Sequence, residues 1–212
     1  MKPGPDNLNM RTVSEGYVKF TVQHTMSPAI EITHWKELND ARTKLRKSGL
    51  IGVNSTGVGF GNLSIRFRGT EFLISGTATG AVPVLSPDEY CVVSSFDIAR
   101  NFVVSSGPIE PSSESMTHGA VYSCSPGANC VIHIHSRAIF DGMIRDNYPA
   151  TPESAAYGTP EIAIALGKCV QETGKGEGVI VMAGHDEGVI AYGPVIERTF
   201  ILIQELYNRY GG

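Results

Sequence analysis

The alternation of apolar and polar residues along the chain predicts most of its strands. Leu63, Ile65 and Phe67 alternate with two polar residues, which is the pattern of a strand with one buried face. A turn at residues 68–70 follows, and a second apolar run after it predicts a hairpin. The same criteria predict strands over residues 17–22, 62–67, 71–75, 91–93, 102–104, 131–135, 179–182 and 189–192.

Apolar residues that recur every three to four positions predict helices between these strands. The first helix is expected to begin after Thr33, a candidate N-cap, and to end near Gly49. A Ser-Pro pair at residues 86–87 predicts a short helical turn, and the serine pair at residues 112–113 is the candidate cap of the next helix. Further helices are expected to start near residues 138, 160 and 194.

Strand pairs and helices are interspersed, without a repeat and without a strict β-α-β order. This order predicts an α/β protein with a mixed, largely antiparallel sheet that is covered by helices on its faces. A length of 212 residues suits one domain with a substantial core. Because residues 1–32 lack sustained periodicity, we expect a poorly defined N-terminal extension over 1–32 and a single domain over 33–212.

Composition narrows the expected partners and environment. The formal charge is −4, so no sequence-wide basic footprint indicates a nucleic-acid partner. The chain has no apolar run long enough for a transmembrane helix, and its first residues do not have the pattern of a secretory signal. Its four cysteines show no C-x-x-C pairing and are expected to be reduced, which favours the cytoplasm.

Two histidines in the predicted strand 131–135 are the first candidates for chemistry. His133 and His135 are two positions apart, so their side chains leave the same face of an extended strand. Two neutral imidazoles on one face are half of a zinc site. The pattern alone also fits two packed core histidines with other hydrogen-bond partners.

Two further stretches suit an anion. The start of a helix at residues 112–113 offers backbone N–H groups and the positive end of the helix dipole. Glu114 follows directly, and it is either a reactive carboxylate or an acid that complements the dipole. The run 75–80 is rich in small and hydroxyl residues, so it either binds an anion through its backbone or is a plain loop.

These motifs occur together in one order: residues 61–66, Ser75-Gly76, Ser112-Ser113-Glu114, His133-x-His135 and Gly184-His185. In this order, over about residues 35–207, the chain resembles the class II aldolase/adducin family, which fuculose-phosphate aldolase typifies. The resemblance implies a three-layer α/β/α sandwich with a central mixed, largely antiparallel sheet. It also implies a homotetramer with active sites near subunit interfaces.

The resemblance assigns roles to individual residues. It implies one Zn²⁺ or another divalent ion per chain on His133, His135 and His185, and three protein ligands leave a coordination position open for substrate. Glu114 matches the catalytic acid/base carboxylate. His118, one helical turn after Glu114, is expected to support the site from outside. The residues expected to bind substrate or phosphate are Asn62, Ser75, Gly76, Thr77, Thr79, Gly80, Ser112 and Ser113, where either Gly76-Thr77 or Thr79-Gly80 aligns with the family's Gly-Thr contact.

Two departures from the family bear on the reaction. Neither Tyr148 nor Tyr157 fits the register of the tyrosine that donates a proton from a neighbouring subunit in fuculose-phosphate aldolase. The family's C-terminal tail over the site is also expected to be absent, because the sequence ends soon after the last predicted helix.

The expected function is that of a zinc-dependent class II aldolase, an aldehyde-lyase of carbohydrate metabolism. It would cleave or form a C–C bond in a small hydroxy-ketone, a sugar phosphate such as fuculose 1-phosphate, through a zinc-stabilised enediolate. One alternative is a pentulose-phosphate epimerase, dehydratase or decarboxylase that uses the same metal site. The other is a non-catalytic, adducin-like assembly protein.

Overall fold

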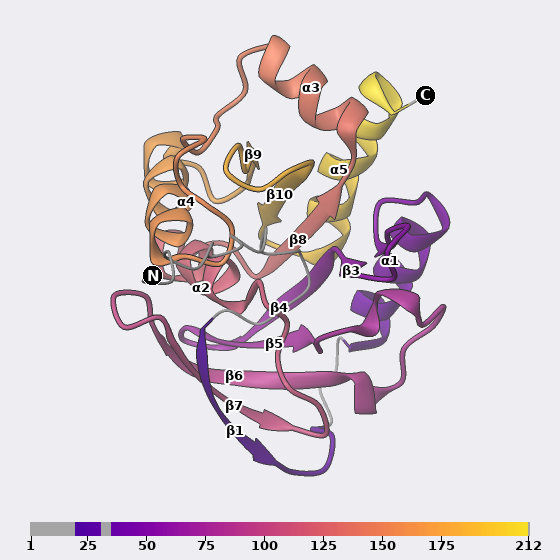
Figure 1. Cartoon of the computed structure of the whole chain (residues 1–212), viewed down its shortest axis with the longest axis vertical. Helices are drawn as coiled ribbons and strands as arrows, with labels where there is room; N and C mark the ends of the chain where they lie inside the picture. Colours follow the sequence, from indigo (N-terminus) through magenta and orange to yellow (C-terminus); the bar gives the residue numbers. More distant parts are fainter. Residues whose placement is uncertain (1–19, 31–34, 212) are drawn as a thin grey trace, which may run out of the picture.

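The centre of the molecule is an eight-stranded mixed sheet (Figure 1). The computed structural model describes residues 20–30 and 35–211. Within them the strand order is β1-β7-β6-β5-β4-β8-β10-β9, and β1 and β7 form the parallel pair while the other neighbours are antiparallel. The strands are β1 Thr21–Met26, β4 Asn62–Arg68, β5 Glu71–Ser75, β6 Tyr90–Asp97, β7 Phe102–Gly107, β8 Cys130–His135, β9 Gly178–Val181 and β10 Gly188–Gly193. A separate two-stranded ribbon consists of β2 Gly52–Val53 and β3 Gly59–Phe60.

Helices cover both faces of this sheet. The helices are α1 Trp35–Lys47, α2 Ser115–Cys124, α3 Arg137–Arg145, α4 Pro160–Thr173 and α5 Ile196–Tyr210, with short 3₁₀ turns η1 Thr79–Ala81 and η2 Pro87–Glu89. One core cluster joins α2 and α4 to one sheet face. A second cluster joins α1, α3 and α5 to the opposite face. The expected three-layer α/β/α architecture is therefore confirmed.

Strand β8 is an interior strand of the sheet, between β4 and β10, and is buried along its whole length. Its residues alternate between the two cores: Val131 packs in the cluster under α2 and α4, while Ile132 and Ile134 pack in the cluster under α1 and α5. Because side chains alternate along a strand, His133 and His135 share the face of Val131. The apolar side of β8 thus fixes the direction of both imidazoles.

The N-terminal strand differs from its expected position. Strand β1 covers residues 21–26 rather than 17–22, and residues 17–19 lie outside the described part of the chain. It pairs in parallel with β7 at the edge of the main sheet. The sheet therefore reaches into the segment 1–32 that the sequence predicts to be an extension. The candidate cap Thr33 also lies outside the described residues.

The helix at Glu114 begins later than the sequence predicts. Helix α2 starts at Ser115 with Glu114 as its N-cap residue, so the prediction that Ser112 or Ser113 caps it is wrong. Ser112 instead forms a tight turn before the helix: its carbonyl oxygen accepts hydrogen bonds from the backbone N–H and the hydroxyl of Ser115. The local sequence does not distinguish these positions, because the Ser112 hydroxyl accepts a hydrogen bond from the Glu114 N–H, as the side chain of an N-cap residue does.

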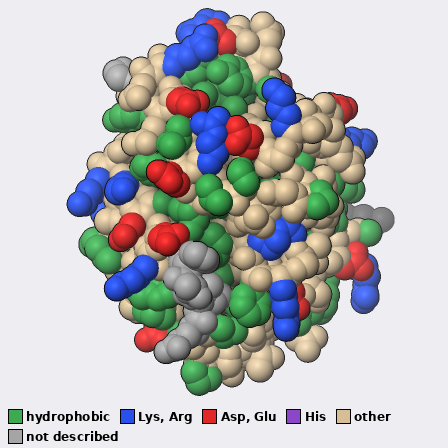
Figure 2. All heavy atoms as spheres, turned by 180° about the vertical axis from the view of Figure 1, so that it is seen from behind, with side chains coloured by type: hydrophobic (Ala, Val, Ile, Leu, Met, Phe, Trp, Pro, Cys, Tyr) green, Lys and Arg blue, Asp and Glu red, His purple; other side chains and the backbone are tan. Residues whose placement is uncertain are grey.

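Charges of both signs are mixed on the face of the molecule opposite to that of Figure 1. Figure 2 shows acidic and basic side chains interspersed among apolar ones on that face. In the described part of the chain, every helix is too short or too polar to cross a membrane.

Candidate metal and anion site

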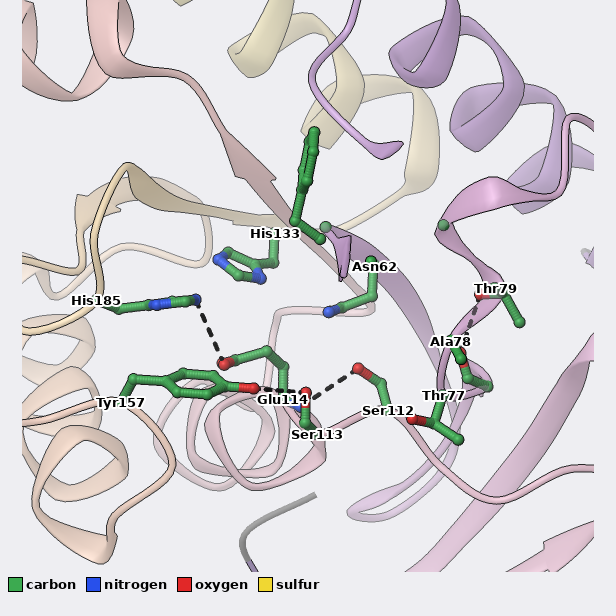
Figure 3. A pocket seen from close by; sticks show the side chains of 15 residues that line it. Asn62, Thr77, Ala78, Thr79, Ser112, Ser113, Glu114, His133, Tyr157 and His185 are labelled. Carbon is green, nitrogen blue, oxygen red and sulfur yellow. Dashed lines mark hydrogen bonds and ion pairs between the residues drawn. The ribbon is translucent and has the colours of Figure 1, made fainter. Parts of the chain in front are cut away.

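Three buried histidines converge near the end of strand β8. His133 and His135 come from β8, and His185 comes from the turn between β9 and β10. Figure 3 shows His133 and His185 side by side at the pocket. One potential ligand atom from each histidine lies within 4.8 Å of the others, and the Nε2 atoms of His135 and His185 are 3.2 Å apart. Because β10 pairs antiparallel with β8, with Gly188 opposite His135, the turn carries His185 onto the other two.

Glycine at position 188 leaves room for this cluster. A Cβ atom at Gly188 would lie 2.9 Å from Cδ2 of His185 and 3.2 Å from Nε2 of His133. The same turn is closed by hydrogen bonds from the Met182 N–H to the Gly188 oxygen and from the Gly188 N–H to the His185 oxygen. The backbone therefore holds the third histidine in place without any ligand.

The electrostatics of the cluster suit a metal ion. Burial lowers the pKa of His133 well below its ordinary value, and the neighbouring imidazoles of His135, His185 and His118 lower it further. Neutral imidazole is the form that binds metals. Both ring nitrogens of His133 are buried without a hydrogen-bond partner among the described residues, and buried nitrogens rarely stay unsatisfied. The three histidines therefore fit a divalent metal ion, with room for a fourth ligand from the pocket.

Glu114 lies next to this cluster as the N-cap residue of α2. Its side chain is buried, and Oε1 is 3.6 Å from Nε2 of His185. Oε2 accepts a hydrogen bond of 2.5 Å from the Thr117 hydroxyl, one turn along the same helix. The carboxylate is thus held at the edge of the pocket beside the histidines, where it can accept or return a proton.

His133, His185 and Glu114 open into one pocket with most of the predicted anion-binding residues (Figure 3). It is lined by Gly59, Phe60, Gly61, Asn62, Gly76, Thr77, Ala78, Thr79, Gly80, Ser112, Ser113, Glu114, His133, Tyr157 and His185. All the residues with a predicted site role lie in this lining except His135, which lies behind it in the histidine cluster, and Ser75. The Ser75 hydroxyl is buried and accepts a hydrogen bond from the Leu63 N–H, so the structure does not bring this residue into the pocket.

The loop over residues 76–80 is held from behind by arginines of α1. The Arg42 guanidinium is almost fully buried and donates to the carbonyl oxygen of Thr79 at 2.7 Å, while Arg46 donates to that of Gly80 at 3.2 Å. Gly80 is packed so closely that a Cβ atom would lie 2.1 Å from the Gly52 oxygen. Two positive charges therefore lie behind a fixed hydroxyl-rich loop, an arrangement that favours an anion in the pocket.

Two polar side chains of the lining offer groups to a ligand. The Asn62 amide lies opposite His133 in the β4–β8 pairing, and its oxygen has no hydrogen-bond partner among the described residues. Ser113 accepts a hydrogen bond of 2.7 Å from the Tyr157 hydroxyl. A ligand with both hydroxyl and anionic groups would meet partners on both sides of the pocket.

Tyr157 has no predicted role, yet it lies in the pocket. Its ring stacks on the imidazole of His185 with centroids 4.3 Å apart. Tyr157 belongs to the irregular segment between α3 and α4, and nothing in its local pattern says where that segment folds. Gly158, which follows it with a φ of 73°, indicates a turn, but it does not indicate which distant residues that turn contacts.

His118 lies beneath the histidine cluster rather than in the pocket. Its Nδ1 is 2.7 Å from the Ser64 hydroxyl, which in turn is 2.8 Å from that of Tyr122. Burial lowers its pKa to about 3, so His118 is neutral in the folded protein. It is therefore a buried packing and hydrogen-bonding residue whose charge state depends on the fold.

We expect His118 to make the protein less stable in mild acid. Its pKa is lower in the folded protein than in the unfolded chain, so protons bind the unfolded chain preferentially as pH falls below about 6.5. The free energy of unfolding should lose about 3 kcal/mol from this group between pH 7 and pH 4. Urea unfolding of wild type and His118→Gln at several pH values measures it. Equal acid slopes in the two proteins would contradict this assignment.

Residues 49–209 match the model of the class II aldolase and adducin N-terminal domain. No curated protein sequence matches the chain significantly.

Solved structures share the fold at low sequence identity. L-fuculose-1-phosphate aldolase from Thermus thermophilus is 20% identical, with a TM-score of 0.59 over 82% of this chain and 89% of that one. Another L-fuculose 1-phosphate aldolase is 21% identical, with a TM-score of 0.64 over 85% of this chain and 84% of that one. YgbL from Klebsiella pneumoniae, described by three candidate activities (aldolase, epimerase and decarboxylase), is 18% identical, with a TM-score of 0.63 over 84% of this chain and 88% of that one.

Proposed function

Because the chain belongs to the class II aldolase/adducin family, we propose that it is a zinc-dependent aldehyde-lyase acting on a small hydroxy-ketone, with sugar phosphates as the substrate class. One observation carries the proposal. Buried His133 and His185 and the Glu114 carboxylate open into the same pocket as a glycine- and hydroxyl-rich loop, and His135 completes the histidine cluster. This supports a metal site beside an anion site, the pair that a phosphorylated carbonyl compound would need.

Each part of the pocket has a distinct task. His133, His135 and His185 would hold the divalent ion, which supplies Lewis-acid polarisation of a carbonyl group when bound. Glu114 is placed to take a proton from a substrate hydroxyl or carbon and to return it. The loop 76–80 with Ser112 and Ser113 would hold the phosphate at the other end of the pocket.

The experiment that tests the proposal is an assay panel on the metal-loaded protein. The panel contains ketose and aldose phosphates, the unphosphorylated sugars, and hydroxy-keto acids. We expect retro-aldol cleavage, with release of an aldehyde, for at least one phosphorylated hydroxy-ketone. No turnover of any phosphorylated sugar, alongside turnover of a hydroxy-keto acid, would contradict the substrate class.

The alternative with support is another reaction at the same metal site. An epimerase, dehydratase or decarboxylase would use the same histidines and carboxylate, and YgbL, one of the proteins with this fold, is described with two of these activities besides aldolase. Product analysis in the same panel separates them, because only aldol cleavage splits the carbon chain without releasing CO₂. The intact histidine cluster and Glu114 argue against a purely adducin-like assembly role.

Ser113→Ala is expected to lower kcat/KM for phosphorylated substrates by an amount equivalent to about 1–3 kcal/mol, the cost of losing a hydrogen bond to a charged group. Unphosphorylated analogues should lose far less, since they carry no such group. The measurement is kcat/KM for a sugar and its phosphate in both proteins. An equal loss on both substrates would mean that Ser113 serves the local fold alone.

We also propose a homotetramer, as the family implies. Light scattering at micromolar concentration tests it, with a mass near four times 22.7 kDa as the expected result. A monomer at that concentration would contradict it and would exclude any proton donor from a neighbouring chain.

A further inference from the structure

Tyr157 connects the two halves of the pocket, the histidine cluster and the serine pair. Its ring stacks on His185 at an interplanar angle of 22°, and its hydroxyl donates to the Ser113 hydroxyl oxygen at 2.7 Å (Figure 3). Its side chain is buried, and its hydrogen bond to the half-buried Ser113 is partly buried. The position of this one side chain therefore bears on both sites.

The backbone around Tyr157 allows little movement of the ring. Its N–H donates to the carbonyl oxygen of Gly184 at 3.0 Å, next to His185. Gly184 itself is pressed against the same segment, since a Cβ atom there would lie 1.8 Å from the Ala155 oxygen. The segment that carries Tyr157 and the turn that carries His185 are thus packed as one unit.

The direction of the hydroxyl bond gives Ser113 a definite role. A serine oxygen that accepts a hydrogen bond directs its own proton to a different acceptor. Hydrogen bonds in such a chain also strengthen one another. The Ser112 hydroxyl oxygen also accepts a hydrogen bond, but from the backbone N–H of Glu114 and at 3.3 Å, which is longer than the 2.7 Å bond from Tyr157 to Ser113. Ser113 is therefore the better donor to an acceptor in the pocket.

We propose that Tyr157 is a positioning residue: its ring holds His185 in the orientation that binds the metal, and its hydroxyl makes Ser113 a hydrogen-bond donor to the anionic group of the substrate. The inference rests on the proposed function, because it assumes a metal on the histidines and an anion beside Ser113. It adds a residue from the same chain to which the sequence pattern assigned no part.

A double-mutant cycle tests the hydroxyl. Inorganic phosphate is titrated calorimetrically into zinc-loaded wild type, Tyr157→Phe, Ser113→Ala and the double variant. Tyr157→Phe keeps the ring and should raise the phosphate Kd about 5- to 10-fold. In the Ser113→Ala background the same change should alter the Kd by less than about twofold, because the tyrosine acts through that serine.

Zinc affinity, measured by competition with a chromophoric chelator, tests the ring. Tyr157→Phe should leave it within about threefold of wild type, whereas Tyr157→Leu should lower it by about 10- to 100-fold. Tyr148→Phe is the matched control: it lies in the same segment but faces the ring of Tyr210, and it should change neither affinity. If Tyr157→Leu fails to fold, the phenylalanine series still decides the hydroxyl part.

The outcomes separate the inference from the function beneath it. The serine part is overturned if Tyr157→Phe leaves the phosphate Kd unchanged. It is also overturned if the increase in Kd of the double variant equals the product of the two single increases. Folded Tyr157→Leu with the zinc affinity of wild type overturns the histidine part. Wild-type protein that holds zinc but binds no phosphate overturns the proposed substrate class instead, and the serine part with it.

Discussion

Replacing His133, His135 or His185 by Ala is expected to reduce the metal content from about one divalent ion per chain to almost none. Each substitution removes one of three protein ligands and leaves a site with two, which holds zinc poorly. His133 should be the most sensitive position, because both of its buried nitrogens lack any other hydrogen-bond partner among the described residues. Elemental analysis of protein purified without chelator measures the stoichiometry.

The matched control for the metal prediction is His24→Ala. His24 lies on the edge strand β1, where its ring nitrogens are 2.9 Å from the Ser105 hydroxyl and 3.1 Å from the Gly107 oxygen. It should leave the metal content unchanged. Full activity after exhaustive chelation, or wild-type metal content in all three histidine variants, would contradict the metal assignment.

Glu114→Gln is expected to keep the fold and most of the metal while it lowers turnover by on the order of 10²–10⁴-fold. The amide is nearly the same size as the carboxylate, so it can keep the hydrogen bond from the Thr117 hydroxyl through its oxygen. It cannot accept the substrate proton, which is the reason for the loss. Steady-state kcat and metal content of the same preparations give the two quantities.

Glu110→Gln serves as the control for Glu114. Glu110 is exposed, four positions earlier in the same segment, and its substitution removes the same charge from the surface. Turnover near the wild-type value is expected for it. If Glu114→Gln also retains its turnover, the base is a different residue. If the variant unfolds, the carboxylate has a structural role.

The sequence predicts those features of the site that depend on neighbours along the chain. The i, i+2 spacing of His133 and His135 in an apolar strand places both imidazoles on one face, and the buried strand β8 has them there. The hairpin of β4 and β5 follows from alternation and a turn in the same way. The motif order additionally identified the family, and with it His185, which no local pattern connects to the other two histidines.

The remaining features depend on contacts between distant segments. His185 reaches the cluster because β10 pairs with β8 in a register that sets Gly188 opposite His135. The sequence of neither strand alone determines that register. Ser75 and Thr79 belong to one hydroxyl-rich run, yet only Thr79 lines the pocket, because Ser75 still lies in the buried end of β5.

Tyr157 is the clearest case of a residue that only the tertiary structure places. Its segment has no periodicity of its own, and its position depends on the packing of Ala155 against Gly184 and on the stacking with His185. Short-range patterns specify which face of an element is buried, because that depends on residues a few positions apart. Which loops meet at the end of the sheet depends instead on the free energy of the whole packed structure. The local sequence therefore determined the chemistry of the histidine strand. The tertiary structure decided which side chains complete its pocket.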